Sequence, residues 1–252
     1  MRFDIITLFP ELFAPFLASG VTRRAYASGQ VDVRLWNPRD YADGNYRRVD
    51  DRPFGGGPGM VMMAEPLARC LAAIRAERGE PEEAHAPLVL FSPIGESLNH
   101  AAVERWSASE GAVLLCGRYE GIAQRFIDAH VTVQMSLGDF VLSGGEIPAM
   151  ALLDAVARLQ PGVLNDEGSH QLDSFNPALD GLLDCPHYTR PEEWAGQQVP
   201  AALLSGHHAQ IERWRRDQRL ATTAHHRPDL IDAARQAGRL APADEAVLAK
   251  LG

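Results

Sequence analysis

Cysteine is scarce in this sequence of 252 residues, with three copies at Cys70, Cys116 and Cys185. They lie far apart along the chain, and none belongs to a C-x-x-C pair. A disulfide framework or a cysteine zinc site would need more regularly or more closely spaced cysteines. The sequence therefore argues against both, and we expect the three thiols to be reduced.

Long hydrophobic runs and the core of a signal peptide are also absent. No apolar run approaches the roughly 18 residues of a membrane-spanning helix. The N-terminal stretch MRFDIITLFPELF is interrupted by Asp4, Pro10 and Glu11. We expect a cytoplasmic protein without a membrane partner, and 46% of apolar residues suffice for a globular core.

Positive charge is in deficit, because 24 Lys and Arg face 33 Asp and Glu for a formal net charge of −9. Proteins that coat nucleic acid nonspecifically depend on many phosphate-facing cations, so this class is disfavoured, while local basic patches stay open. The dinucleotide pattern G-x-G-x-x-G and the Walker pattern ending in Gly-Lys-Ser/Thr are missing. Their absence disfavours nicotinamide cofactors and nucleoside triphosphates as ligands.

What the sequence does contain is an alternation of short β-rich runs and helical patterns. The runs are apolar throughout, as strands buried on both faces of a sheet are. This alternation predicts an α/β domain with a largely parallel sheet. The expected strands are residues 3–9, 31–36, 88–92, 112–116 and 131–135, and the expected helices are about 65–78, 99–109, 120–129 and 146–159.

The pattern changes after Arg158. Pro161 and Gly162 end the preceding helix, and the polar stretch up to residue 173 has no periodicity, which predicts a linker or lid. Beyond it the chain has helical periodicity and almost no strand signal. We expect a first domain over residues 1–164, a flexible linker over 165–173 and a small helical domain over 174–252.

Three consecutive expected strands end in unusual loops, FSPIGES (91–97), CGRYEG (116–121) and SLGDFVLSGG (136–145). Ligands collect at the carboxyl ends of the strands in an open parallel sheet, and glycine lets the backbone approach a ligand closely. The three loops therefore predict a single pocket. The alternative for the last loop is a tight strand-to-helix turn, with Ser143 and Glu146 as the capping box of the following helix.

Three further clusters leave their role open. The arginine- and glycine-rich stretch 47–62 suits a polyanion or nucleobase near the backbone, or a disordered surface loop. The histidine pairs at 207–208 and 225–226 are poorly placed to share a metal ion. Arg213, Arg216 and Arg219 have helical spacing beside Trp214, which fits an RNA-phosphate site or a solvated helix face.

Five segments taken together resemble one family: RPFGGGPGMVM, LCGRYEGI, SLGDFVLSGGEIPAM, DSF and GLLDCPHYTRP. Their order and spacing are similar to those of the bacterial tRNA (guanine-N1)-methyltransferase family TrmD, within the knotted SPOUT superfamily. The resemblance implies transfer of a methyl group from S-adenosylmethionine to N1 of guanosine 37 in tRNA. It also implies a deep trefoil knot in the first domain, an exception to the rule that chains avoid threading.

The resemblance assigns residues to this chemistry. Guanine N1 carries a proton at neutral pH, so methylation needs a base for that proton and a cation for the charge that gathers on O6. Asp173 matches the family's proposed base, and Arg158 matches its O6 partner. The methyl-donor pocket maps onto Pro93, Gly117, Tyr119, Glu120, Leu137, Gly138, Asp139, Phe140, Val141, Leu142, Gly144, Gly145 and Pro148.

The resemblance further implies a homodimer with its active site at the subunit interface, in which Asp173 serves the donor pocket of the other subunit. Residues 162–173 are then expected to close as a lid. The family is described as needing Mg²⁺, but the sequence shows no obvious cluster of oxygen ligands, although Glu120 is near the pocket by analogy. Tyrosine is the family's usual residue at Phe140, so any hydrogen bond from that hydroxyl is lost here.

Two alternatives remain at the level of sequence. A different SPOUT methyltransferase could act on another RNA base or on ribose, but GGGPGM and LLDCPHYTRP belong to the guanine-N1 family. A noncatalytic RNA-binding protein could keep the knot without the chemistry, but the presence of both Asp173 and Arg158 disfavours it.

Overall fold

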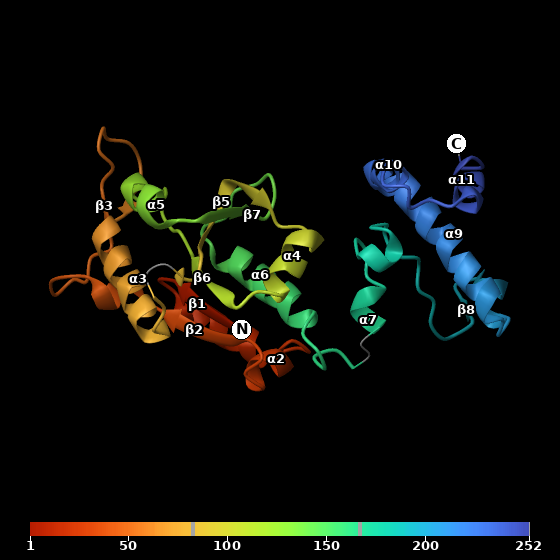
Figure 1. The fold of residues 1–252 in the computed structure, drawn as a ribbon, viewed down its shortest axis with the longest axis horizontal. Helices are drawn as coiled ribbons and strands as arrows, with labels where there is room; N and C mark the ends of the chain where they lie inside the picture. Colours follow the sequence, from red (N-terminus) through yellow and green to blue (C-terminus); the bar gives the residue numbers. More distant parts are fainter. Residues whose placement is uncertain (82–83, 166–167, 252) are drawn as a thin grey trace. The chain divides into compact units, whose positions relative to one another are not determined.

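The computed structural model describes residues 1–81, 84–165 and 168–251. The chain divides into two compact units, Met1–Leu164 and Asn165–Gly252, and Figure 1 colours the first from red to green and the second from green to blue. Residues 166 and 167 of the expected linker lie outside the described residues. The linker's flexibility therefore stays a prediction.

The first unit is built on a five-stranded sheet with the order β2-β1-β6-β5-β7. Every neighbouring pair in this sheet is parallel, which confirms the expected mixed α/β class with a parallel central sheet. Its strands are β1 (Arg2–Ile6), β2 (Asp32–Trp36), β5 (Leu88–Ser97), β6 (Gly111–Leu115) and β7 (Val133–Ser136).

Helices cover both faces of this sheet (Figure 1). On one face lie α1 (Phe13–Ala18), α2 (Arg23–Ala27), α4 (His100–Ser107) and α6 (Glu146–Arg158), and on the other lie α3 (Ala64–Arg78) and α5 (Gln124–His130). Along β6, Ala112 and Leu114 pack toward α4 and α6, whereas Val113 and Leu115 pack toward α3 and α5. Burial on both faces is the reason why the strand sequences are apolar at successive positions.

Several boundaries differ from the sequence-based expectation. The first strand ends at Ile6 rather than residue 9, because the chain turns into η1 (Pro10–Leu12). The strand β5 continues to Ser97, with a register shift between Phe91 and Glu96, so the stretch 91–97 belongs to this strand rather than to a loop after it. The helix expected from residue 120 begins at Gln124, because residues 121–123 bond to Met62 instead.

The sequence also did not reveal three short elements: η2 (Pro38–Tyr41), β3 (Asp50–Asp51) and β4 (Val61–Met62). The last two form an antiparallel pair at the base of the glycine-rich loop. Elements of two to four residues are shorter than the window in which a period can be recognised. The same reason explains why α1 and α2 were not expected.

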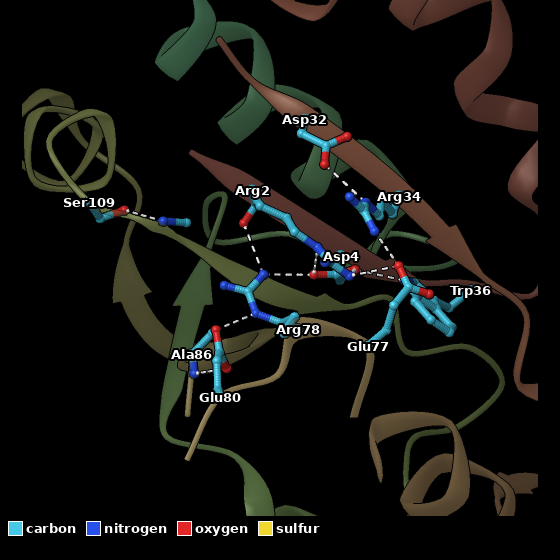
Figure 2. Close-up of polar contacts among 11 residues, drawn as sticks. Arg2, Asp4, Asp32, Arg34, Trp36, Glu77, Arg78, Glu80, Ala86 and Ser109 are labelled. Carbon is cyan, nitrogen blue, oxygen red and sulfur yellow. Dashed lines mark hydrogen bonds and ion pairs between the residues drawn. The ribbon is translucent and has the colours of Figure 1, made fainter. Parts of the chain in front are cut away.

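A buried carboxylate lies in the middle of β1. The Asp4 side chain has no exposed surface and accepts hydrogen bonds from the guanidinium groups of Arg2 and Arg78 and from Trp36 Nε1. Figure 2 shows these groups converging on Asp4, with Glu80 on the far side of Arg78. The charge is thus paired and fully hydrogen-bonded, as a buried carboxylate must be.

The second unit is mostly helical, as expected. Its elements are α7 (Gly168–Gln171), η4 (Pro177–Leu179), β8 (Glu193–Trp194), β9 (Gln197–Gln198), α8 (Ala201–Leu204), α9 (His208–His226), α10 (Pro228–Gln236) and α11 (Pro242–Leu248). The short antiparallel pair β8-β9 is an addition that the sequence did not indicate. The core of this second unit consists of Leu182, Leu220, Ile231 and Ala234. Within the described part of the chain, no helix is long and apolar enough to cross a membrane.

Candidate functional site

The three glycine-containing loops meet around a cavity of about 250 Å³. They follow or end the neighbouring strands β6, β5 and β7, so the parallel sheet delivers all three to the same edge. Asp139 is not among the described residues that line the cavity. The predicted residues that do line it are Pro93, Gly117, Tyr119, Glu120, Leu137, Gly138, Phe140, Val141, Leu142, Gly144, Gly145 and Pro148.

The loop after β7 is folded tightly on itself. Gly138 has a φ of 157°, and its N–H donates to Ser136 Oγ over 3.2 Å. A Cβ at Gly138 would lie 2.7 Å from a carbon of the Phe140 ring, so this ring packs directly on the glycine. Phe140 therefore contributes an apolar surface here.

Tyr119 lies at the rim of the cavity in a strained conformation, with a φ of 60°. Its hydroxyl accepts a hydrogen bond of 3.4 Å from Arg39 in η2. Partial burial, together with the nearby Asp50, raises the pKa of the Tyr119 phenol above its ordinary value. The phenol is therefore neutral at physiological pH and can donate as well as accept.

The glycine-rich stretch 47–62 joins the same region. Met62 N–H donates to Gly121 O over 2.8 Å, and Glu120 N–H donates to Met60 O over 3.0 Å. A Cβ at Gly59 would lie 2.4 Å from Glu120 Oε1, so the glutamate side chain occupies the space that only glycine leaves. The end of the loop is thus hydrogen-bonded to the CGRYEG segment. Phe54, nearer the start of the loop, is 99% exposed.

The expected capping box at the start of α6 is wrong. Gly145 is the N-cap, with no side-chain cap, and Glu146 is 1% exposed. The Glu146 carboxylate accepts a hydrogen bond of 2.9 Å from Thr7 Oγ1 and forms an ion pair of 2.9 Å with Arg118. A buried ion pair outcompetes the cap, since an unpaired buried carboxylate would be far costlier than an uncapped helix.

Arg118 is a cavity-lining residue that the sequence reasoning missed. Its Nη1 donates to Ser143 O over 3.2 Å, and its guanidinium carbon lies 4.5 Å from the centre of the Phe9 ring. The available signal was a single cation between glycines in the loop CGRYEG, at the end of an apolar strand. Cation–π contacts of this kind are typical for arginine.

Cys116 is fully buried beside this ion pair. Burial raises the pKa of its thiol well above the ordinary value, and the Glu146 charge raises it further. The thiol therefore stays protonated at neutral pH. This excludes it as a thiolate nucleophile in the cavity.

The two residues expected to carry the chemistry belong to different units. Arg158 is the last residue of α6 in the first unit. Asp173 lies after α7 in the second unit, where its N–H donates to His170 O and its carbonyl accepts from Asn176 N–H. Each is therefore placed within its own unit, and their roles stay predictions.

The arginines of α9 form ion pairs with aspartates of their own unit. Arg216 forms ion pairs with Asp180 and Asp244, and Arg219 is buried and pairs with Asp184. Arg213 reaches Asp217 and Asp244. These arginines hold α9 to the rest of its unit, and an interpretation as a solvated face is wrong for the pair at 216 and 219, while the RNA-phosphate site stays a prediction.

The described residues hold no group of three or more His, Cys, Asp and Glu side chains that could bind a metal ion. The expected histidine pairs lie at the two ends of α9, His207 and His208 at its start and His225 and His226 at its end. Glu120 lines the cavity but is not part of such a group among the described residues.

Comparison with known proteins gives a consistent result. Residues 1–233 match the family described as "tRNA (Guanine-1)-methyltransferase TrmD". The chain is 84% identical over 251 residues to a protein of Paracidovorax citrulli, covering 100% of this chain and 98% of the relative. A Polaromonas relative is 76% identical (100% and 97% covered), and one from Bordetella pertussis is 56% identical (100% and 98% covered). All three relatives are named tRNA (guanine-N(1)-)-methyltransferase.

Proposed function

The chain belongs to the tRNA (guanine-1)-methyltransferase family TrmD and is a tRNA (guanine-N1)-methyltransferase, and from this premise we propose that it methylates N1 of guanosine 37 with Asp173 as base and Arg158 as partner of O6. Membership implies the SPOUT fold and S-adenosylmethionine as methyl donor. The observation that carries the proposal is the cavity at which the loops of β5, β6 and β7 converge.

The cavity has the character of a donor pocket for a neutral adenosine. Much of its lining is backbone at Gly117, Gly138, Gly144 and Gly145, together with apolar side chains such as Ile122. Backbone N–H and C=O groups can pair with adenine edges without bringing charge. This explains why glycines recur in loops that lack a phosphate signature.

The methyl transfer itself needs the target nitrogen to lose a proton. The Asp173 carboxylate takes the proton from N1, and the N1 electron pair then forms a bond to the donor's methyl carbon. The carbon–sulfur bond breaks, and its electrons return to sulfur, which becomes a neutral thioether. The Arg158 guanidinium donates to O6, where the negative charge of the deprotonated base gathers.

We also propose that the enzyme acts as a homodimer, in which Asp173 of one subunit serves the pocket of the other. Large apolar side chains are exposed on two segments that Arg118 joins, with Val141 84% and Ile147 57% exposed on one, and Phe9 38% and Leu12 44% on the other. Such a concentration is typical of an interface between protein subunits. Residues 162–173, of which 166 and 167 are not described, would close as a lid.

Two further family features have unequal support. A trefoil knot is part of the proposal, and the close return of the chain supports it: Gly145 N–H donates to Gly117 O over 3.1 Å, beside the end of β6. Mg²⁺ has no comparable support, because no suitable cluster of acidic residues occurs among the described residues. The chemistry above assigns no step to it.

The proposed function is tested by incubating the protein with methyl-labelled S-adenosylmethionine and unmodified tRNA that carries guanosine at 36 and 37. We expect label in 1-methylguanosine at position 37 after nuclease digestion. Label on another base or on ribose would point to a different SPOUT activity. Binding of tRNA with no transfer at all would indicate a noncatalytic RNA-binding protein.

A further inference from the structure

The buried residue Glu146 contacts the cavity lining without being part of it. We propose that Glu146 is a positioning residue that holds Arg118, and through Arg118 the loops on either side of the donor pocket, in the arrangement that binds S-adenosylmethionine. This inference rests on the proposed function, because it takes the cavity to be the donor site. Glu146 would act through Arg118 and touch no reacting atom.

The carboxylate has two firm contacts and almost no solvent. Only 2% of the Glu146 side-chain surface is exposed, and its Oε2 lies 2.9 Å from Arg118 Nη2. Oε1 accepts from Arg118 Nε over 3.2 Å and from Thr7 Oγ1 over 2.9 Å. Thr7 Oγ1 in turn accepts from Phe9 N–H over 3.0 Å, so the group is also bonded to the segment that follows β1.

Arg118 extends this arrangement to the pocket. It lines the cavity, donates to Ser143 O in the loop after β7, and lies over the Phe9 ring. Three segments that are far apart in sequence therefore meet at one guanidinium group: residues 7–9, 116–121 and 143–146. A planar guanidinium with five fixed donors suits this task better than an ammonium group.

The two glycines of the SGGE turn leave room for these contacts. A Cβ at Gly144 would lie 2.3 Å from Arg118 Nε, and a Cβ at Gly145 would lie 2.7 Å from Cys116 Cα. At both positions the missing side chain admits another part of the protein. The two glycines thus let the loop that ends at residue 145 pack closely against the segment 116–118, and these packed segments form part of the pocket wall.

A contribution to stability alone would not explain this placement. Replacing a buried ion pair with well-packed apolar residues is often neutral or stabilising, so such a pair is weak evidence for stability. Here the Glu146–Arg118 pair lies between the loops 116–121 and 137–145, and it holds them at a fixed distance from each other. A site whose supporting residues are loose loses affinity before the protein loses its fold.

The test compares Glu146→Gln with a matched control, Asp4→Asn, in the full-length protein. Asp4 is also a buried carboxylate paired with arginine in the first unit, but it lies in the middle of β1, and its partners Arg2 and Arg78 do not belong to the loops that line the cavity. Affinity for S-adenosylmethionine is measured by calorimetry without tRNA, and KM for each substrate and kcat are measured with tRNA. Thermal unfolding of each variant is recorded in parallel.

We expect Glu146→Gln to raise the Kd and the KM for S-adenosylmethionine about tenfold, with little change in the KM for tRNA, because loss of one contact in a coupled network costs about that factor. Asp4→Asn should lower the unfolding temperature without changing that Kd. An unchanged Kd in folded Glu146→Gln, or an equal rise in Asp4→Asn, would overturn the inference while leaving the proposed function intact. A wild-type protein that binds no S-adenosylmethionine would overturn both.

Thr7→Val provides a second, milder variant if Glu146→Gln does not fold. It keeps the shape of Thr7 and the Arg118 ion pair but removes the hydroxyl that orients the carboxylate. A rise of about threefold or more in the same Kd supports the positioning role, since one hydrogen bond to a charged group is lost. A Kd equal to that of the wild type contradicts it.

Discussion

Asp173 and Arg158 are the residues on which the proposed chemistry depends. A carboxylate can accept the N1 proton and a guanidinium can stabilise the charge on O6, and both are needed because guanine N1 is protonated at neutral pH. The two residues come from different compact units of the chain. Their cooperation in the reaction stays a prediction, which the variants below test.

Replacement of Asp173 with Ala should reduce kcat by about 10² to 10⁴, the usual contribution of a general base. Affinity for S-adenosylmethionine should stay near that of the wild type, because the cavity proposed as the donor pocket belongs to the first unit. Single-turnover methylation assays measure the first quantity and calorimetry the second. Asp232→Ala, an exposed aspartate on α10, is the control and should keep full activity. Near-normal turnover of Asp173→Ala would remove it as the base.

Asp4 is a buried charged residue that we expect to contribute to the stability of the fold rather than to the chemistry. Removing its carboxylate would break the buried ion pair with Arg78, whose side chain is 7% exposed, and would leave Glu80 to compensate that guanidinium (Figure 2). Asp4→Ala should lower the free energy of unfolding by about 3–5 kcal/mol, as breaking a buried pair does. Urea denaturation measures this change. Asp32→Ala, which removes an exposed partner of Arg34, should change it little, and equal effects would show that burial of Asp4 is unimportant.

At the scale of elements, the start of α6 decides the shape of the pocket. The helix begins directly after Gly145, whose N–H is bonded to Gly117 O at the end of β6. The start of α6 and the segment directly after β6 are thus in backbone-to-backbone contact at this point. A Cβ at Gly144 would meet Arg118 and one at Gly145 would meet the backbone of Cys116, which explains the glycines at the end of this loop.

Gly145→Ala should weaken binding of S-adenosylmethionine even though the φ of −82° at this position suits alanine. The added Cβ would lie 2.7 Å from Cys116 Cα, and backbone cannot move aside as a flexible side chain can. Gly29→Ala is the control: its φ of 75° makes alanine strained, but its Cβ meets no atom within 4 Å. Gly29→Ala should be less stable than the wild type but should keep its affinity for S-adenosylmethionine. If both variants bind the donor like the wild type, close packing of α6 on β6 does not shape the pocket.

At the scale of the whole molecule, the two units are stabilised by different means. The first has two large apolar clusters, one on each face of its sheet. The second has a small core and relies on ion pairs between α9 and the segments around it. A small unit buries less apolar surface per residue, so paired charges carry more of its structure.

This difference predicts that the second unit is the more sensitive to acid. Burial by itself would raise the pKa of Asp244, but hydrogen bonds from Arg216 and from Ala241 N–H, with the nearby arginine charges, lower that pKa. The pKa of Asp184 is lowered in the same way, against the effect of burial, by hydrogen bonds from Cys185 N–H, Arg219 and His187. Because the unfolded chain binds these protons more readily, the stabilisation is complete above the ordinary aspartate pKa of about 3.9 and is lost as the pH falls through the lowered folded values.

Hydrogen exchange of the α9 amides, followed by mass spectrometry from about pH 5 down to pH 3 after correction for intrinsic rates, checks this prediction. Protection of α9 should fall with the pH, and Asp244→Asn should weaken that dependence. The exposed variant Asp232→Asn should behave like the wild type. Protection that is constant across this range would contradict the role of the ion pairs.

The oligomeric state is a second property of the whole molecule. Ile147→Asp places a charge among the exposed apolar side chains of the proposed subunit interface and should give a monomer with little or no activity. Light scattering and the methylation assay measure the two effects. Leu204→Asp, an exposed apolar residue of α8 in the second unit, should remain dimeric and active. A wild-type monomer with full activity would contradict the dimer.

The sequence by itself determined the parallel α/β class, the helical character of the second unit and the place where three loops converge. These follow from local information: apolar runs mark strands buried on both faces, and parallel strands present their carboxyl ends at one edge. The family motifs were equally legible, because each is a continuous segment.

Only the tertiary structure decided what single charged residues do. Glu146 has the spacing of a capping box, yet it is buried against Thr7 and Arg118, and the arginines of α9 have the spacing of a phosphate site, yet they bind aspartates of their own unit. A charge interacts with whatever lies within a few ångströms of it, and those neighbours are distant in sequence. Local spacing can therefore predict a helix but not the partner of a side chain on it.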